Sequence, residues 1–129
     1  MIVYLDASVA VGAIKDEAGS ADLREQLDGL LKDTHLLLSG RLLETEMRRT
    51  ATRLGISIAA VNSTLDAIAI VEHEKADFRL AGSFGSRNLG SLDALHLATA
   101  MRVQADAMLT RDRSLAAASQ TEGLELLEV

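Results

Sequence analysis

The stretch IVYLDASVAV, residues 2–11, determines which class of fold this chain adopts. Its first part, Ile2–Leu5, is a β-branched and aromatic run that predicts a buried strand. Asp6 ends that run, and the Ala- and Val-rich residues behind it predict a helix from about Ala7 to Lys15. A buried strand that leads directly into a helix is typical of a parallel sheet covered by helices.

The same alternation of strand and helix patterns continues to the end of the chain. Strands are expected at 35–38, 107–110 and 124–127, while 69–71 either ends a helix or forms a short strand. Helices are expected at about 20–32, 39–55, 57–69, 77–84, 91–103 and 113–119. The expected N-caps are Ser20, Ser39, Ser57 and Ser91. This pattern predicts an α/β fold whose ligands bind beyond the carboxyl ends of the strands.

The composition narrows the class of protein. At 129 residues a single domain spanning 1–129 is expected, and an apolar content of 48% is enough for a core. The absence of Cys excludes disulfides, cysteine–zinc sites and thiol catalysis, and the three His lack metal-ligand spacing. No apolar run reaches the ~18 residues of a membrane span, and the N-terminus lacks the basic region of a signal peptide. We therefore expect a cytoplasmic protein that does not bind membranes.

The charge is unevenly distributed. Thirteen Lys and Arg against nineteen Asp and Glu give a net charge of −6, which taken whole disfavours a nucleic-acid partner. An aromatic content of 2% argues against a platform for stacking bases. Most of the arginines nevertheless lie in the middle of the chain, at 41, 48, 49, 53, 79, 87, 102, 111 and 113. Ordinary solvated helix faces explain this pattern as well as a binding surface does.

Three aspartates lie at positions where α/β proteins commonly have their ligand-binding or catalytic sites. Asp6 directly follows the first strand, and Asp112 comes two residues after the strand at 107–110. Asp93 lies in the first turn of the helix that begins SLDALHLATA. Each also has a purely structural explanation, since Asp6 and Asp112 can cap helices and Asp93 can gain ~0.3–1 kcal/mol from the helix dipole.

Glu46 is a fourth candidate because of the helix side that it occupies. It shares that side with Leu42 and Leu43, whereas Glu44 lies roughly 200° away around the helix. Glu44 precedes Arg48 by four residues, which is the favoured order for a surface ion pair. Glu46 is therefore expected to point inward, where a carboxylate requires a partner.

Convergence of these four acids would require a cation. Two carboxylates ~5 Å apart repel by ~3 kcal/mol at an effective dielectric of ~20. Oxygen ligands suit Mg²⁺ or Mn²⁺ rather than zinc. Such an ion lowers the pKa of a bound water and stabilises a phosphoryl transition state.

Four blocks of this sequence together resemble the PIN-domain ribonucleases, and most closely the VapC-type toxins of bacterial toxin–antitoxin pairs. VYLDASVAV at 3–11 is similar to the opening strand of that family, with its first acid at Asp6. LSGRLLETEMRR at 38–49 aligns the second acid with Glu46, and LGSLDALHLATA at 89–100 aligns the third with Asp93. AMLTRDRSLAAAS at 107–119 aligns the last acid with Asp112.

The resemblance implies a PIN-like three-layer fold with a five-stranded parallel sheet of order 3-2-1-4-5. It implies an endoribonuclease toxin that cleaves RNA, usually tRNA or rRNA, with water activated by Mg²⁺ or Mn²⁺. It also implies a homodimer and a small antitoxin protein that occupies the acidic pocket. The implied catalytic and metal-binding acids are Asp6, Glu46, Asp93 and Asp112. The groups expected to orient a carboxylate or phosphate, or to contact RNA, are Ser8, Thr110, Arg48 and Arg49.

Other interpretations stay open at this point. A non-catalytic PIN-like module would use the same acids to bind a partner protein, and metal affinity would distinguish it from an enzyme. A phosphotransferase of the haloacid dehalogenase class also has an Asp after its first strand, but it requires a second Asp where Ser8 stands. No Gly-x-Gly-x-x-Gly or Walker sequence supports nucleotide binding. His96, one turn after Asp93, is expected to be a buried histidine whose hydrogen bonds are satisfied.

Overall fold

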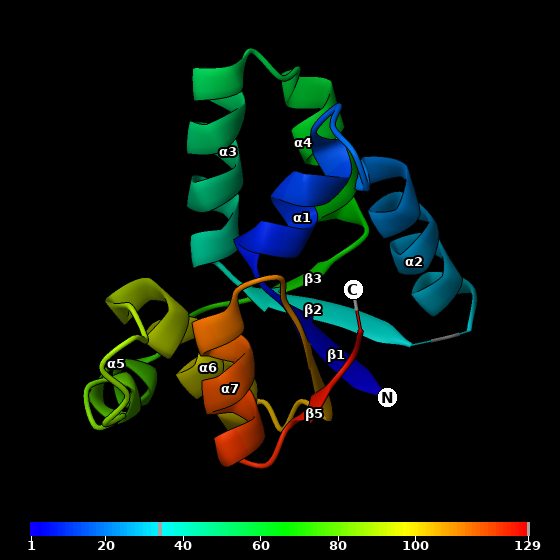
Figure 1. The fold of residues 1–129 in the computed structure, drawn as a ribbon. Helices are drawn as coiled ribbons and strands as arrows, with labels where there is room; N and C mark the ends of the chain where they lie inside the picture. Colours follow the sequence, from blue (N-terminus) through cyan, green and yellow to red (C-terminus); the bar gives the residue numbers. More distant parts are fainter. Residues whose placement is uncertain (34, 129) are drawn as a thin grey trace.

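The computed structural model describes residues 1–33 and 35–128. Five parallel strands form one sheet in the order β3-β2-β1-β4-β5 (Figure 1). The strands are β1 (Ile2–Leu5), β2 (Leu36–Gly40), β3 (Ala69–Val71), β4 (Ala107–Leu109) and β5 (Glu125–Leu126). This topology confirms the predicted α/β fold and its strand order, and the segment at 69–71 is a strand.

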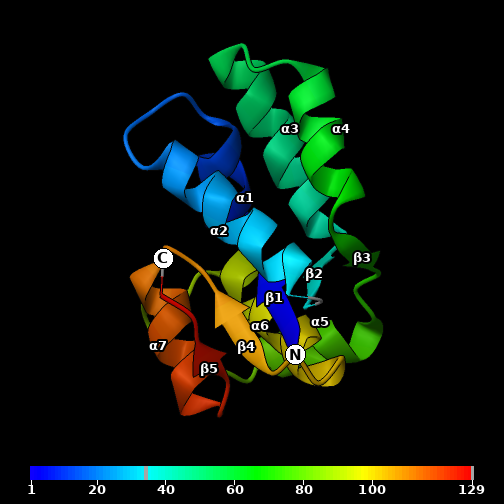
Figure 2. The same cartoon turned by 90° about the vertical axis from the view of Figure 1, so that its right-hand side faces the viewer.

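Helices cover both faces of this sheet. They are α1 (Ala7–Ile14), α2 (Ser20–Lys32), α3 (Leu42–Leu54), α4 (Ile58–Asp66), α5 (Lys75–Ala81), α6 (Ser91–Arg102) and α7 (Arg113–Thr121). Helices α1–α4 lie on one face and α5–α7 on the other, as the two views in Figures 1 and 2 show. In the described ranges, no helix is long and apolar enough to cross a membrane.

The central strand β1 supplies both hydrophobic cores. Val3 and Leu5 belong to the core formed with α1–α4, whereas Tyr4 belongs to the core formed with α6 and α7. All three side chains are completely buried. Successive residues of a strand face opposite sides of the sheet, so the alternation within IVYL explains why the strand is apolar throughout.

The parallel register brings distant chain segments to one edge of the sheet. Leu5 pairs with Leu109, so Asp6 and Thr110 are the next residues beyond neighbouring strand ends. On the other side Tyr4 pairs with Leu38, which brings the end of β2 to the same edge. The carboxyl ends of β1, β2 and β4 therefore meet where the candidate acids were expected.

The helix caps agree only partly with the predicted serines. Ser57 caps α4 as predicted and accepts a 3.2 Å hydrogen bond from the Ala60 N–H. Ser20 and Ser91 are the first residues of their helices, one position inside the predicted cap. The prediction for Ser39 is wrong, because Ser39 lies within β2 and donates a 2.7 Å hydrogen bond to the Leu5 carbonyl of β1.

His73 takes the place of the missing cap at the start of α3. The Leu42 N–H donates to His73 Nε2 at 3.0 Å, which satisfies an N–H that has no partner within the helix. The His73 Nδ1 atom lies 2.7 Å from the Thr99 hydroxyl, and that hydroxyl donates to Asp77. The proton of a neutral imidazole is therefore on Nδ1. Burial lowers the pKa of His73, with a further contribution from His96, which favours this neutral form.

The His73 ring packs directly on Gly40, so a larger side chain at position 40 should destabilise the fold. A Cβ at position 40 would overlap the His73 ring and lie 2.8 Å from the Tyr4 hydroxyl oxygen. Gly40→Ala should therefore lower the free energy of unfolding by about 1–3 kcal/mol, measured by urea denaturation. Gly29→Ala, within α2 and with open space around its Cβ, is the matched control. It should raise stability by about 0.5–1 kcal/mol, and equal effects of the two changes would contradict this packing.

Asp77 joins α5 to α6 through a buried carboxylate. It is 1% exposed, and its oxygens accept hydrogen bonds from the Glu74 N–H at 2.9 Å and from Arg102 Nε at 2.8 Å. Thr99 donates a third, at 3.1 Å. Burial alone would raise the pKa of Asp77, but these donors and the Arg102 charge outweigh it, so the pKa lies below its ordinary value.

This lowered pKa gives a pH dependence of stability. The ionised Asp77 stabilises the fold at pH values above 3.8, its ordinary pKa, and this stabilisation is lost as the pH falls from there through the native pKa. Asp77→Asn should cost about 1–3 kcal/mol of unfolding free energy at pH 7. The difference from the parent protein should shrink in acid-denaturation series below pH 3.8. Asp28 is an exposed residue of α2, and Asp28→Asn is the control that should leave the free energy of unfolding nearly unchanged. If Asp77→Asn lowered this free energy equally at every pH, the stabilising role of the ionised Asp77 would be contradicted.

Candidate functional site

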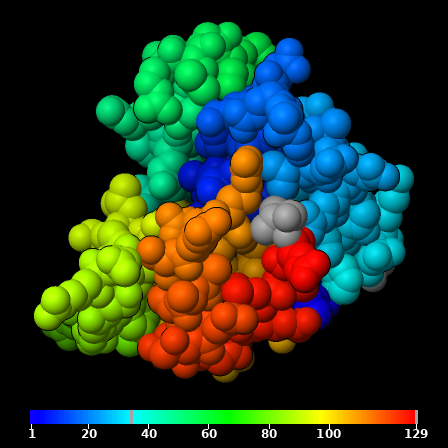
Figure 3. Space-filling view, viewed as in Figure 1, coloured from blue at the N-terminus to red at the C-terminus, as the bar shows by residue number. Residues whose placement is uncertain are grey.

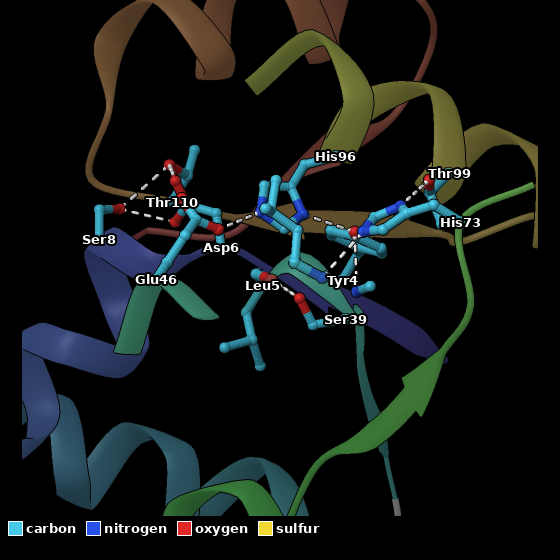
Figure 4. Close-up of polar contacts among 12 residues, drawn as sticks. Tyr4, Leu5, Asp6, Ser8, Ser39, Glu46, His73, His96, Thr99 and Thr110 are labelled. Carbon is cyan, nitrogen blue, oxygen red and sulfur yellow. Dashed lines mark hydrogen bonds and ion pairs between the residues drawn. The ribbon is translucent and has the colours of Figure 1, made fainter. Parts of the chain in front are cut away.

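Asp6 is a buried carboxylate held at both oxygens. It is 3% exposed, and its oxygens accept hydrogen bonds from the Ser8 hydroxyl at 2.6 Å and the Thr110 hydroxyl at 2.9 Å (Figure 4). Burial raises the pKa of Asp6, and the two hydroxyl donors partly offset that rise. Asp6 stands at the N-cap position of α1, but its side chain makes no capping bond. Asp6 is therefore not explained as a helix cap.

The two hydroxyls that hold Asp6 are themselves fixed by backbone N–H groups. The Arg111 N–H donates to Ser8 Oγ at 2.8 Å, and the Asp112 N–H donates to Thr110 Oγ1 at 3.0 Å. Each hydroxyl accepts from the backbone and is free to donate to the carboxylate. This arrangement locks the β1–α1 turn to the β4–α7 turn.

Glu46 points inward, as predicted, and its carboxylate has a hydrogen-bond partner. Its Oε1 lies 2.6 Å from Nε2 of His96, a completely buried residue of α6. His96 Nδ1 in turn lies 2.7 Å from the Tyr4 hydroxyl, and the Gly40 N–H donates to that hydroxyl at 2.9 Å. Figure 4 shows Tyr4, His96 and Glu46 in one row. His96 is thus the satisfied buried histidine that was expected, and it also orients a candidate acid.

The hydrogen bonds define the proton positions in this row. Burial raises the pKa of Tyr4, so its hydroxyl keeps its proton and donates it to His96 Nδ1. An ionised Glu46 only accepts hydrogen bonds, so His96 Nε2 carries the ring proton. His96 thus joins Tyr4 to Glu46 and presents its Nε2 donor to Glu46 Oε1.

Asp93 and Asp112 complete the group of four acids. Asp93 lies in the first turn of α6, and Asp112 caps α7 by accepting a 2.8 Å hydrogen bond from the Leu115 N–H. Desolvation raises the pKa of Asp93 to about 6, with further contributions from the charges of Asp112, Asp6 and Glu46. The charges of the other three acids therefore all act on Asp93. Asp112 combines its capping role with this electrostatic one.

The chemistry of the group suits a hard divalent cation. Its donors are all carboxylate oxygens, and within the described part of the chain no hydrogen bond reaches the half-buried Asp93. In these described residues, no three His, Asp or Glu side chains already surround a single point as metal ligands do. The acids thus fit a metal in type and charge, while the side chains are not drawn together into a closed coordination shell.

The two arginines expected to contact RNA lie in different environments. Arg48 is ion-paired with Glu44 at 3.0 Å and donates to Asn62 at 3.0 Å. Arg49 lines a cavity of about 560 Å³ that Glu46 also lines. Both arginines also line a second hollow, but of the two only Arg49 shares a cavity with a candidate acid.

Two features of this site, the Tyr4 hydroxyl and the Gly40 N–H, do not follow from the sequence patterns. Tyr4 was assigned only to a buried strand, although a buried tyrosine requires a partner for its hydroxyl. The Gly40 N–H was not considered, because it is a backbone group. An inward tyrosine on the central strand and a histidine three residues after Asp93 were the available signals.

Solved structures of low sequence identity share this fold. One is the sarcin–ricin loop cleaving toxin VapC20 of Mycobacterium tuberculosis, with a TM-score of 0.72, 12% identity, and coverage of 90% of this chain and 94% of that one. Another is VapBC2 of Rickettsia felis bound to a promoter DNA fragment, with a TM-score of 0.71, 17% identity and 98% coverage of both chains. PAE2754 of Pyrobaculum aerophilum gives a TM-score of 0.63 at 20% identity, covering 98% of this chain and 83% of that one.

Sequence comparison gives the family. A search of curated proteins found no significant match. The sequence model described as PIN domain matches residues 3–120, a range that includes all four candidate acids and the whole sheet except the start of β1 and the short edge strand β5. The chain therefore belongs to the PIN domain family.

Proposed function

We propose that this protein is a metal-dependent endoribonuclease and the toxin of a toxin–antitoxin pair. The observation that carries the proposal is the position of Asp93, whose pKa is raised by burial and by the charges of Asp112, Asp6 and Glu46 from other elements. A cluster of carboxylates with a perturbed pKa is costly to stability and is typical of functional sites. Membership of the PIN domain family adds to this support.

The four acids would hold one or two Mg²⁺ or Mn²⁺ ions. When bound, such an ion supplies Lewis acidity that lowers the pKa of water and neutralises charge on a phosphodiester. Ser8 and Thr110 fix both oxygens of Asp6, and His96 fixes one oxygen of Glu46. These bonds hold the carboxylates in place before substrate arrives, which lowers the reorganisation that catalysis requires.

The fold of the structural neighbours guides the choice of substrate and partner. VapC20 is a sarcin–ricin loop cleaving toxin, so ribosomal RNA is a candidate substrate here, along with tRNA. We further propose a small antitoxin protein that covers the acidic edge, and a homodimer in solution. The alternative is a non-catalytic module in which the same acids bind only a basic group of the partner.

The nuclease proposal predicts cleavage that depends on one carboxylate. Purified protein without antitoxin, incubated with total RNA and Mg²⁺ or Mn²⁺, should produce discrete new RNA ends that disappear with EDTA. Asp93→Asn should lower the cleavage rate by at least ~10²-fold while the circular dichroism spectrum is unchanged. Glu25→Gln, which removes an exposed α2 charge, is the matched control and should cleave normally.

Metal affinity separates the enzyme from the docking module. Millimolar Mn²⁺ should raise the melting temperature of the parent protein because it binds only the folded state. It should not do so for Asp93→Asn, whereas Glu25→Gln should respond like the parent. Folded protein that neither cleaves RNA nor responds to Mn²⁺ would favour the docking module.

The hydrogen bond from His96 to Glu46 gives a separate prediction. His96→Leu keeps the volume but removes the donor, and should lower the cleavage rate or the metal affinity by about 10–100-fold. His96→Gln retains an N–H donor on a side chain of similar reach and should recover part of the loss. Cleavage by His96→Leu at the parental rate, in protein shown to be folded, would remove this hydrogen bond from the mechanism.

A further inference from the structure

Helix α3 carries arginines on two sides, and their surroundings differ. Arg41 and Arg48 lie on the side of Glu44. Arg41 is paired with Glu72 at 2.7 Å and Glu44 at 3.3 Å, and Arg48 is paired with Glu44 at 3.0 Å. The positive charge on this side is therefore neutralised within the protein itself.

Arg49 and Arg53 lie on the side of Glu46. The three residues are spaced i, i+3 and i+7, which places them in one row along the helix. Both arginines are exposed, and the described residues offer neither of them an ion pair or a hydrogen bond. In a protein with a net charge of −6, two adjacent arginines without a carboxylate partner leave a local positive charge for an external anion.

The two arginines line the same cavity as a candidate acid. This cavity, of about 560 Å³, is bordered by Arg49, Arg53, Glu46, Thr45, Thr50 and Leu92. Figure 3 shows the surface hollowed between α3 and the α5–α6 half of the molecule. The helix rises 1.5 Å per residue, so Arg53 lies about 10 Å further along α3 than Glu46. An elongated anion that reaches from the acids along α3 would meet both guanidinium groups.

We propose that Arg49 and Arg53 form a phosphate-binding subsite for the RNA strand beside the scissile phosphate. The strand leaves the carboxylate group along the Glu46 side of α3, and its backbone phosphates accept hydrogen bonds from the two guanidinium groups. Arginine suits this role because its planar donors match phosphate oxygens. The exposed Leu92 side chain gives the same cavity an apolar wall. This subsite rests on the proposed nuclease function and adds to it the path of the substrate.

A binding experiment without cleavage tests the subsite. The full chain is titrated against a fluorescently labelled single-stranded RNA of mixed sequence in EDTA, over a series of salt concentrations. The double variant R49Q/R53Q should weaken binding by about tenfold at low salt. The slope of log K against log salt should become less negative by about 0.7 for each phosphate that the variant no longer neutralises. R49K/R53K, which keeps the charges, should retain most of the binding.

K75Q/R79Q is the matched control, because it removes two exposed positive charges, also four residues apart, from α5 and outside this cavity. It should leave RNA affinity within about twofold and the salt slope unchanged. Equal effects of K75Q/R79Q and R49Q/R53Q, or no effect of either, would overturn the subsite. An equal loss of binding in R49K/R53K would also overturn it.

Cleavage kinetics separate this proposal from the nuclease proposal. With Mg²⁺ or Mn²⁺, R49Q/R53Q should raise KM for a long RNA and leave kcat within about twofold, since it removes binding away from the reacting atoms. RNA shortened on the side that follows α3 should be cleaved equally by the parent and the double variant. If the parent binds RNA through these arginines but does not cleave, the nuclease proposal fails and the subsite stands. If the parent cleaves and both KM and RNA binding are unaffected by R49Q/R53Q, only the subsite fails.

Discussion

A carboxylate that is 3% exposed must have a hydrogen-bond donor for each oxygen, and in this protein that requirement at Asp6 organises the edge of the sheet. Ser8 and Thr110 supply the donors, and backbone N–H groups of the β4–α7 turn hold both hydroxyls in place. The same requirement is met at Glu46 by a chain of hydrogen bonds from the Gly40 backbone through Tyr4 and His96. Asp6 is thereby positioned by the turns at the sheet edge, and Glu46 by a hydrogen-bonded row that includes Tyr4 of the α6–α7 core.

The negative charges at this edge of the sheet destabilise the folded protein. Asp93 receives no hydrogen bond from the described residues, and desolvation together with three neighbouring carboxylates raises its pKa to about 6. The buried carboxylate of Asp77 differs from that of Asp93, because Arg102 and Thr99 compensate its charge and lower its pKa. The chain therefore compensates the charge of Asp77 and leaves that of Asp93 uncompensated, which is the pattern expected where a cation or substrate completes the arrangement.

Local patterns predicted the architecture, and contacts between distant residues supplied the rest. The alternation of strands and helices and the position of Asp6 after β1 follow from periodicities of a few residues, and both are found in the structure. The cap of α3 is His73, 31 residues from Leu42, and the partner of Glu46 is His96, 50 residues away. Neither pair is visible in local periodicity. The prediction for Ser39 failed for the same reason, since the Leu5 carbonyl of β1 competes for its hydroxyl.

The placement of the four acids at positions 6, 46, 93 and 112 has a consequence for the order in which the chain is made. Synthesis proceeds from the N-terminus, so the first acid emerges with β1, while β4, Thr110 and the cap of α7 follow all the other elements of the site. Until β4 pairs with β1, Asp6 lacks the Thr110 donor and Asp93 lacks its Asp112 neighbour. A fragment that ends before residue 107 cannot assemble this edge, so the proposed activity requires a chain that has been translated beyond Asp112.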